Sequence, residues 1–284
     1  NERYFIQFDC IKTSQLINYP KFILNTKDFE SLSPVLIFCE FEQDVYQSFI
    51  SQFQVEFNEG IWLILKISDN PNQFRVNLIP EYFESVPDPI IRYLGTGCQA
   101  TSPQDNRRLR RIFRIKTTHE ERLNTLKKLL ENKPAKLKFP MDVAVYNVGQ
   151  GNLNAILDNK GIPLVYYDVG GGAYWNAFTY PNPNPLKLCF TNDPIIILSH
   201  WDFDHWWTFN KLIRKKILPK NCVTTWIVPK QDLGPIQFKF YDLLKANGHT
   251  IIVWSYKLKP KIDFLFRHIG RIIKCNGSTK NDSG

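Results

Sequence analysis

The sequence lacks several features that would place it in a class at once. No apolar run approaches the roughly 20 residues of a membrane helix. The first residues, N-E-R-Y-F-I-Q-F-D-C, contain neither a long apolar stretch nor a secretory cleavage signal. The six cysteines are scattered without a C-x-x-C pair, which argues against a zinc ribbon and a disulfide framework. We therefore expect a cytoplasmic protein with reduced thiols and no membrane partner.

Methionine is also scarce, since Met141 is the only one in 284 residues. The chain thus has no initiator, and it ends in the polar tail S-T-K-N-D-S-G. We expect it to be a piece of a longer protein, whose other domains or subunits are possible partners.

The sequence does contain ample apolar material and an excess of positive charge. A hydrophobic content of 43% and an aromatic content of 14% argue for a real core and against disorder. The net charge of +9 favours polyanionic partners, so nucleic acid or a nucleotide is possible. The densest basic cluster lies between Arg107 and Lys116, and its alternative interpretation is a solvated surface.

Residues 1–138 show no constellation of metal ligands or nucleophiles, and we assign them to a smaller α+β domain of unknown role. A helix is expected at Asp44–Phe57 and another after Thr118, with a loop at Pro87–Gln104 and the domain boundary near Pro134–Pro140. A turn at Asn70–Asn72 suggests a hairpin between the last two predicted strands. The predicted strands are Tyr4–Ile11, Lys21–Leu24, Val35–Phe41, Ile61–Ile67 and Phe74–Ile79.

Residues 139–284 have a different texture, in which strand-like runs come first and then alternate with helical patterns. This order predicts an α/β domain, a sheet flanked by helices. The expected helices are 206–217 and 235–246. The expected strands are 143–148, 153–157, 164–168, 195–198, 223–228, 250–254 and 264–275.

The most informative stretch is I-I-I-L-S-H-W-D-F-D-H-W, residues 195–206. An apolar run typical of a buried strand ends in His200, Asp202, Asp204 and His205. Imidazole nitrogens and carboxylates are the groups that hold zinc, manganese or iron. The pattern predicts a metal site at the end of this strand. A Ser-His-Asp site through Ser199 and His200 is disfavoured, because neighbours on a strand point to opposite faces.

Three motifs in this half resemble the metallo-β-lactamase fold superfamily in content and order. They are V-G-Q-G-N at 148–152, Y-D-V-G-G at 167–171 and S-H-W-D-F-D-H at 199–205. The first is similar to the V-G-Q-G-D turn of the ComEC-type DNA-uptake branch. The resemblance covers about residues 141–284. It implies the N-terminal part of an αββα-type fold, cut before the site is complete.

The resemblance also implies roles for individual residues. By position, His200 and Asp202 would bind one divalent metal ion, and Asp204 and His205 a second, with Zn or Mn as the candidates. Asp202 stands where the commonest motif has a second His, which favours harder ions such as Mn²⁺. Asp168 and Ser199 would support the ligand loop, which is the S-H-W-D-F-D-H segment at 199–205, through hydrogen bonds. The family's bridging Asp and further His have no counterpart, and we expect His249 and His268 to be structural.

The function this implies is metal-dependent hydrolysis, most simply by a phosphodiesterase or nuclease that uses a metal-activated hydroxide. Asp204 is the expected catalytic residue. The candidate substrate contacts are Trp201, Trp206 and Arg214. The aromatic side chains that could stack on bases are Trp201, Phe203, Trp206, Trp207 and Trp175, and the alternative for most of them is packing in the core. The alternatives are a catalytically degenerate module that binds or scaffolds, and a hydrolase of a thioester or lactam.

Overall fold

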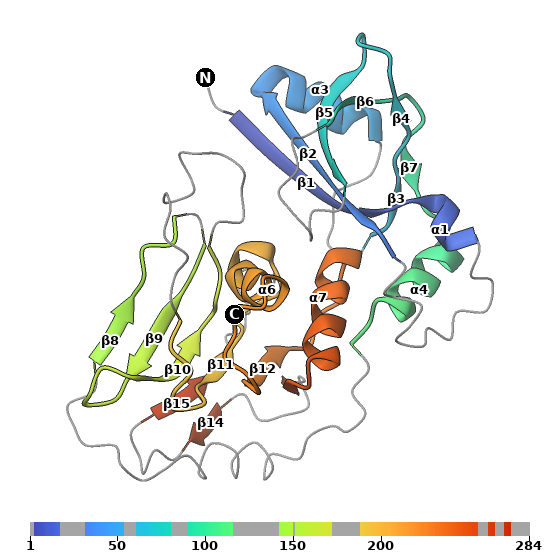
Figure 1. Ribbon diagram of the computed structural model, residues 1–284. Helices are drawn as coiled ribbons and strands as arrows, with labels where there is room; N and C mark the ends of the chain where they lie inside the picture. The colour runs from blue at the N-terminus through green and yellow to red at the C-terminus, as the bar shows by residue number, and fades with distance from the viewer. Residues whose placement is uncertain are drawn as a thin grey trace. The chain divides into compact units, whose positions relative to one another are not determined.

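The computed structural model describes residues 3–17, 32–53, 61–80, 90–115, 142–149, 151–171, 188–254, 261–264 and 270–273 (Figure 1). Contacts group the chain into two compact units. One consists of Asn1–Arg114 with Asp232–Asp242, and the other of Ile115–Gln231 with Leu243–Gly284. The boundary expected near Pro134–Pro140 lies outside the described residues and stays a prediction. The return of a late segment to the first unit was not anticipated from the sequence.

The first unit is built on a five-stranded antiparallel sheet with the order β1-β2-β5-β6-β4. Its strands are β1 (Arg3–Ile11), β2 (Pro34–Glu42), β4 (Ile67–Ser68), β5 (Phe74–Pro80) and β6 (Ile90–Leu94). A second, two-stranded sheet pairs β3 (Leu63–Ile64) with β7 (Gln99–Ala100). The helices are α1 (Thr13–Ile17), α3 (Gln43–Phe53) and α4 (Pro103–Ile112).

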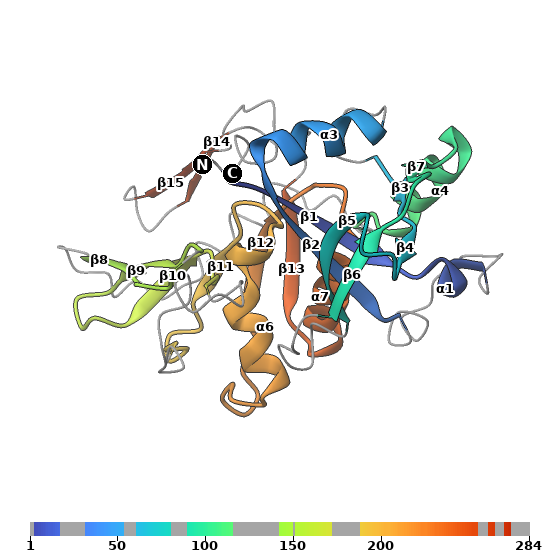
Figure 2. The same ribbon diagram turned by 90° about the horizontal axis from the view of Figure 1, so that it is seen from above.

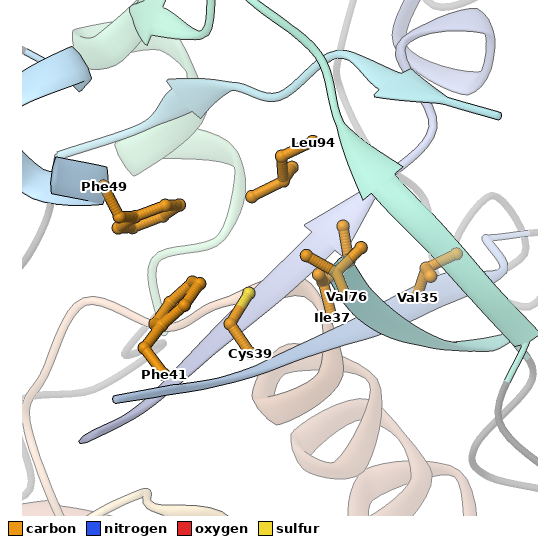
Figure 3. Close-up of a cluster of buried hydrophobic side chains, with 7 residues drawn as sticks. All are labelled: Val35, Ile37, Cys39, Phe41, Phe49, Val76 and Leu94. Atoms are coloured by element: carbon orange, nitrogen blue, oxygen red, sulfur yellow. The ribbon is translucent and has the colours of Figure 1, made fainter. Parts of the chain in front are cut away.

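One hydrophobic cluster of this unit lies between the five-stranded sheet and α3. Figure 3 shows its seven buried residues, which include Cys39 and Phe41 from β2 and Phe49 from α3. Phe41 and Phe49 have ring centroids 4.6 Å apart. Each buried aromatic side chain removes enough apolar surface from water to contribute about 2 kcal/mol, so this contact holds the helix against the sheet.

Two sequence expectations for this unit are wrong. The Asn70 turn is present, with Gln73 N donating to Asn70 O at 3.2 Å. It does not form the expected hairpin, because β4 and β5 each pair with β6 instead. The loop expected over Pro87–Gln104 contains β6, whose run I-I-R-Y-L was obscured by flanking Pro and Gly. The strand expected at Lys21–Leu24 and the helix after Thr118 lie outside the described residues.

Asp9 on β1 caps the start of α7 (Pro235–Ala246), whose first residues belong to the first unit. The Ile236 backbone N–H donates to both Asp9 carboxylate oxygens, at 3.0 and 2.9 Å. A Cβ on Gly234 would lie 2.2 Å from Asp9 Oδ2, so only glycine leaves room for this carboxylate. The cap is therefore a long-range contact between residues more than 200 positions apart.

We predict that Asp9→Ala lowers the free energy of unfolding by about 1–2 kcal/mol, because the first turn of α7 loses the Asp9 carboxylate as an acceptor for Ile236 N. Urea unfolding followed by circular dichroism measures this change. Asp9→Asn is the matched control, since its amide oxygen still accepts from Ile236 N, and it should cost less than half as much. Equal stability of Asp9→Ala and the unmodified protein would contradict the capping role.

The second unit is built on a six-stranded mixed sheet with the order β13-β12-β11-β10-β9-β8 (Figure 2). Strands β10 to β13 are parallel, and β8 and β9 are added antiparallel. The strands are β8 (Asp142–Val145), β9 (Asn154–Leu157), β10 (Pro163–Tyr167), β11 (Ile195–Ile197), β12 (Thr225–Pro229) and β13 (Thr250–Trp254). A separate antiparallel pair consists of β14 (Lys261–Phe264) and β15 (Gly270–Ile273).

The apolar run at 195–198 forms a buried central strand, as its composition predicts. Ile195 and Ile196 of β11 are 1% and 0% exposed. A short 3₁₀ turn, η1 (Phe203–His205), and helix α6 (Trp207–Arg214) follow. Helix α6, which Figure 2 shows beside β12, packs on the sheet through Phe209, whose ring meets that of Trp226 edge to face at 4.9 Å. The unit thus combines a mixed sheet with helices, and its assignment to the α/β class with an αββα-type fold stays a prediction.

Two further observations concern membrane-spanning helices and the state of the cysteines. Within the described ranges, no helix is both long and apolar enough to cross a membrane. Each of the five described cysteines is a free thiol. Burial raises the pKa of the Cys39 thiol to about 12, so this side chain acts as an apolar core residue.

Candidate metal centre

Asp168 lies at the centre of the hydrogen-bond network of the candidate site. It follows β10 in a left-handed conformation, with φ of 58°, and its side chain is fully buried. Its Oδ1 accepts a hydrogen bond from Ser199 N at 2.8 Å, and its Oδ2 accepts from Ser199 Oγ and Asn152 Nδ2, each at 2.8 Å. A buried carboxylate is stable only when its lone pairs are occupied in this way. Asp168 therefore joins the ends of two parallel strands.

Both histidines direct their Nδ1 atoms toward Asp168 or toward its hydrogen-bond partner Ser199. His205 Nδ1 lies 2.7 Å from Asp168 Oδ2, and His200 Nδ1 lies 2.9 Å from Ser199 Oγ. Because the Ser199 hydroxyl donates to Asp168, its oxygen is left to accept from His200. In the neutral form of each ring, Nδ1 therefore carries the proton and Nε2 presents a lone pair. This is the tautomer that a metal-binding histidine adopts when a partner holds its other nitrogen.

One carboxylate stands beside each free imidazole nitrogen. Asp202 Oδ2 lies 3.4 Å from His200 Nε2, and Asp204 Oδ1 lies 3.8 Å from His205 Nε2. With metal–ligand bonds of about 2.0–2.1 Å, two tetrahedral ligand atoms are about 3.4 Å apart, so the first pair fits one ion and the second fits after a small rotation. The Asp202 and Asp204 side chains are 40% and 25% exposed, so an ion can reach them.

Each pair supplies two protein ligands from the described part of the chain. Among the described residues, no group of three or more His, Cys, Asp or Glu side chains could hold a metal ion. The remaining coordination positions would be filled by water, by substrate or by side chains outside the described ranges. The residues present fit two half-sites, and their roles as metal ligands stay predictions.

The carboxylates around His205 shift its protonation. Burial opposes a charge on the ring, yet the hydrogen bond and charge of Asp168, together with the charges of Asp204 and Asp202, raise the pKa of His205. A concentration of negative charge that stabilises an imidazolium also stabilises a bound cation. The electrostatics of the site therefore favour cations.

The V-G-Q-G-N and Y-D-V-G-G motifs, which we call the glycine turns, hold the ligand loop by hydrogen bonds between backbone atoms. Asp204 O accepts hydrogen bonds from Asn152 N and Gly171 N, each at 3.2 Å, and Gly170 N donates to Asn152 O at 2.9 Å. A Cβ on Gly170 would lie 1.5 Å from Asp204 O. The V-G-Q-G-N and Y-D-V-G-G motifs are thus glycine-rich because the ligand loop lies directly on their backbone.

The prediction that Trp201 and Trp206 stack on substrate is wrong, because both indoles belong to the core. They are 1% and 0% exposed. Trp201 Nε1 donates to Pro229 O at 3.0 Å, and Trp206 Nε1 donates to Trp201 O at 2.9 Å. Aromatic residues next to a ligand motif can serve packing as readily as binding, and only burial distinguishes the two. Trp175 lies outside the described residues.

Arg214, the third expected substrate contact, ends α6. Its Nε donates to Asn210 Oδ1 at 3.3 Å, and it is partly exposed. Arg214 lies nine residues after His205 in the chain, so most of the helix, about 12 Å in length, separates the two. Its role as a substrate contact stays a prediction.

The reason given against a Ser-His-Asp site is also wrong. β11 ends at Ile197, so Ser199 and His200 lie in a loop and their side chains meet. The hydroxyl nevertheless donates to Asp168 rather than to a histidine. A serine nucleophile needs an imidazole that accepts its proton, so the arrangement positions residues and does not activate Ser199.

Two supporting residues, Asn152 and Gln231, were not predicted from the sequence. Asn152 donates to Asp168, and its place in the V-G-Q-G-N turn was the available signal. Gln231 Oε1 accepts a hydrogen bond from Trp201 N at 3.0 Å and so holds the peptide between His200 and Asp202. No local signal in the sequence marked Gln231.

The expected structural role of His249 agrees with its contacts, since its Nδ1 accepts from Thr224 N at 3.1 Å and burial lowers its pKa. His268 lies outside the described residues.

Comparison of the chain with models of known protein families, with characterised proteins and with solved structures finds no match.

Proposed function

We propose that the second unit contains a two-metal hydrolase centre, with His200 and Asp202 as ligands of one divalent cation and Asp204 and His205 as ligands of another. The observation that supports this proposal most strongly is that both histidines have the same hydrogen-bonding arrangement. Both Nδ1 atoms are engaged through Ser199 and Asp168, so both Nε2 atoms are available beside a carboxylate. Zn²⁺ and Mn²⁺ are the candidate ions, and the Asp-rich ligand set favours Mn²⁺.

The chemistry follows from these positions. Two bound divalent cations would supply a hydroxide near neutral pH and neutralise charge that develops on the substrate. Asp168 and Ser199 fix both imidazole rings, and the buried Trp201 fixes the turn between His200 and Asp202. The Asp204 carboxylate, which remains partly exposed, is the proposed acceptor of the proton that the attacking water releases.

The proposed substrate is a phosphodiester, in nucleic acid or a nucleotide. The net charge of +9 favours a polyanionic substrate. The motif resemblance to the DNA-uptake branch favours the same class of bond. We propose that the protein acts as a phosphodiesterase or nuclease in the cytoplasm.

We expect His200→Ala and Asp204→Ala each to remove one bound Mn²⁺ and to lower metal-dependent hydrolysis of bis(p-nitrophenyl) phosphate by about 100-fold or more, because each removes one of only two ligands in a pair. Metal is counted by electron paramagnetic resonance and hydrolysis by absorbance. Asp142→Ala is the control, since Asp142 is an exposed carboxylate on the edge strand β8. Unchanged activity in both site variants would refute the proposal.

The second candidate is a catalytically degenerate module that binds or scaffolds. It is favoured by the finding that no described group offers three metal-binding side chains, and by Asp202 in place of the commoner His. Metal analysis of the purified protein separates the two. Binding of transition metal at one or two equivalents supports the hydrolase, and its absence at saturating metal supports the module.

A further inference from the structure

Helix α4 of the first unit presents a strongly basic surface. Between Pro103 and Ile115 the chain carries five arginines and one acidic residue. All five arginines are exposed. Arg107 and Arg111 are four residues apart and so lie one above the other on the same side of the helix. We refer to Arg107, Arg111 and Arg114 as the arginine surface.

The helix beneath this surface is firmly anchored. Ser102 caps it, with Asp105 N donating to Ser102 Oγ at 3.1 Å. Leu109 and Ile112 are buried on the opposite side. Phe113, at the C-terminal cap, is 1% exposed and stacks on Trp62 with ring centroids 5.1 Å apart. The arginines are therefore displayed on a fixed support, which lowers the entropic cost of binding a ligand.

The charge of the arginine surface has no acidic partner among the described residues. Arg110 is paired with Asp232, to which its Nε donates at 2.7 Å. Asp105 instead accepts from Ser102 Oγ at 2.7 Å. No described carboxylate lies within salt-bridge distance of Arg107, Arg111 or Arg114. Like charges at positions i and i+4 destabilise a helix, so this spacing costs folding stability and is best explained by a ligand.

We propose that the arginine surface binds the sugar-phosphate backbone of nucleic acid without base specificity. Guanidinium groups match phosphate oxygens through paired hydrogen bonds and stay charged at every physiological pH. Apart from Pro103 at its first position, the other exposed side chains of the helix are polar, such as Gln104, and offer no large apolar group for insertion into a lipid bilayer. The proposal shares with the proposed function only a phosphodiester ligand, and it does not depend on the metal centre.

The test is fluorescence anisotropy with a labelled single-stranded DNA oligonucleotide, in EDTA so that no hydrolysis occurs. We expect the triple variant Arg107→Gln, Arg111→Gln, Arg114→Gln to bind at least about tenfold more weakly near 0.1 M salt. The slope of log K against log salt should decrease by about 2, since each lost phosphate contact removes about 0.7.

The matched control removes three exposed charges from the second unit, in the triple variant Lys215→Gln, Lys216→Gln, Lys220→Gln. It should keep most of the affinity and the salt slope. His200→Ala should bind as the unmodified protein does, even where its hydrolysis is lost, so the two proposals fail separately. Equal losses in the arginine and lysine variants would overturn this one, as would binding to phosphatidylserine vesicles without binding to the oligonucleotide.

Discussion

Replacement of Gly170 by alanine is expected to disrupt the second unit more than any other single methyl group added to its glycine turns. The new Cβ would lie 1.5 Å from Asp204 O and 2.8 Å from His205 Cα. The ligand loop would have to move away, which breaks the hydrogen bonds from Asn152 N and Gly171 N to Asp204 O. We expect a loss of about 4 kcal/mol or more in the free energy of unfolding.

Urea unfolding followed by tryptophan fluorescence measures this loss, because the buried Trp201 and Trp206 report on the same loop. Gly248→Ala is the control. A Cβ at Gly248 would meet nothing within 4 Å, and its φ of 79° leaves only backbone strain, worth about 1 kcal/mol. If Gly170→Ala costs no more than Gly248→Ala, the ligand loop does not rest on the glycine turn as described.

Replacement of Asp168 is expected to destabilise the unit and to weaken metal binding together. Asp168→Ala leaves the donors of Ser199, Asn152 and His205 unsatisfied, at a cost of about 3–5 kcal/mol. Asp168→Asn keeps the shape and tolerates the positive φ. It still places an NH₂ group against a donor whichever way the amide faces, since both oxygens accept hydrogen bonds. It should cost about 2 kcal/mol and lower Mn²⁺ affinity about 10–100-fold.

Asp193→Asn is the control for this pair of variants. Asp193 has the same residue type and a similar left-handed backbone, with φ of 45°, but its side chain is exposed. Its replacement should change the free energy of unfolding by no more than about 0.5 kcal/mol. Metal affinity that survives in Asp168→Asn, despite loss of stability, would mean that the histidines do not need this carboxylate for their orientation.

Asp168 and Gly170 explain why the candidate centre can be rigid although its ligands lie in a loop. Asp168 holds the loop by side chains, and Gly170 holds it by backbone. Both follow β10, the parallel neighbour of β11. Because parallel strands bring their carboxyl ends to one edge, consecutive motifs in the chain converge there. The site is thus supported from the neighbouring strand rather than from its own.

Elements with a strong local pattern were predicted closely from the sequence. The helix at Pro235–Ala246 and the strand at Thr250–Trp254 have the predicted bounds. The strand β6 was missed because its five residues are flanked by Pro and Gly, and its place between β5 and β4 depends on pairing with distant strands. Short strands contain too few residues for their period to stand out.

Within the candidate centre, residue types and spacing nominated His200, Asp202, Asp204 and His205, and the structure brings each histidine beside one of the carboxylates. The orientation of the His205 imidazole could not be read from the chain, because it depends on a hydrogen bond to Asp168, more than 30 residues earlier. The same limit misled the interpretation of Trp201 and Trp206. A tryptophan has the same pattern in sequence whether its face is buried or open to solvent.

The sequence by itself determined the buried strand at 195–197, the cluster of potential metal ligands that follows it, and the excess of positive charge on one short segment. These are properties of neighbouring residues, so local periodicity and composition are sufficient to find them. Only the tertiary structure decided that the glycine turns carry the ligand loop and that Asp168 sets the histidine tautomers. It also decided that residues 232–242 belong with the first unit. Each of these depends on contacts between residues far apart in the chain, and pairings at that distance leave no periodic trace in a single sequence.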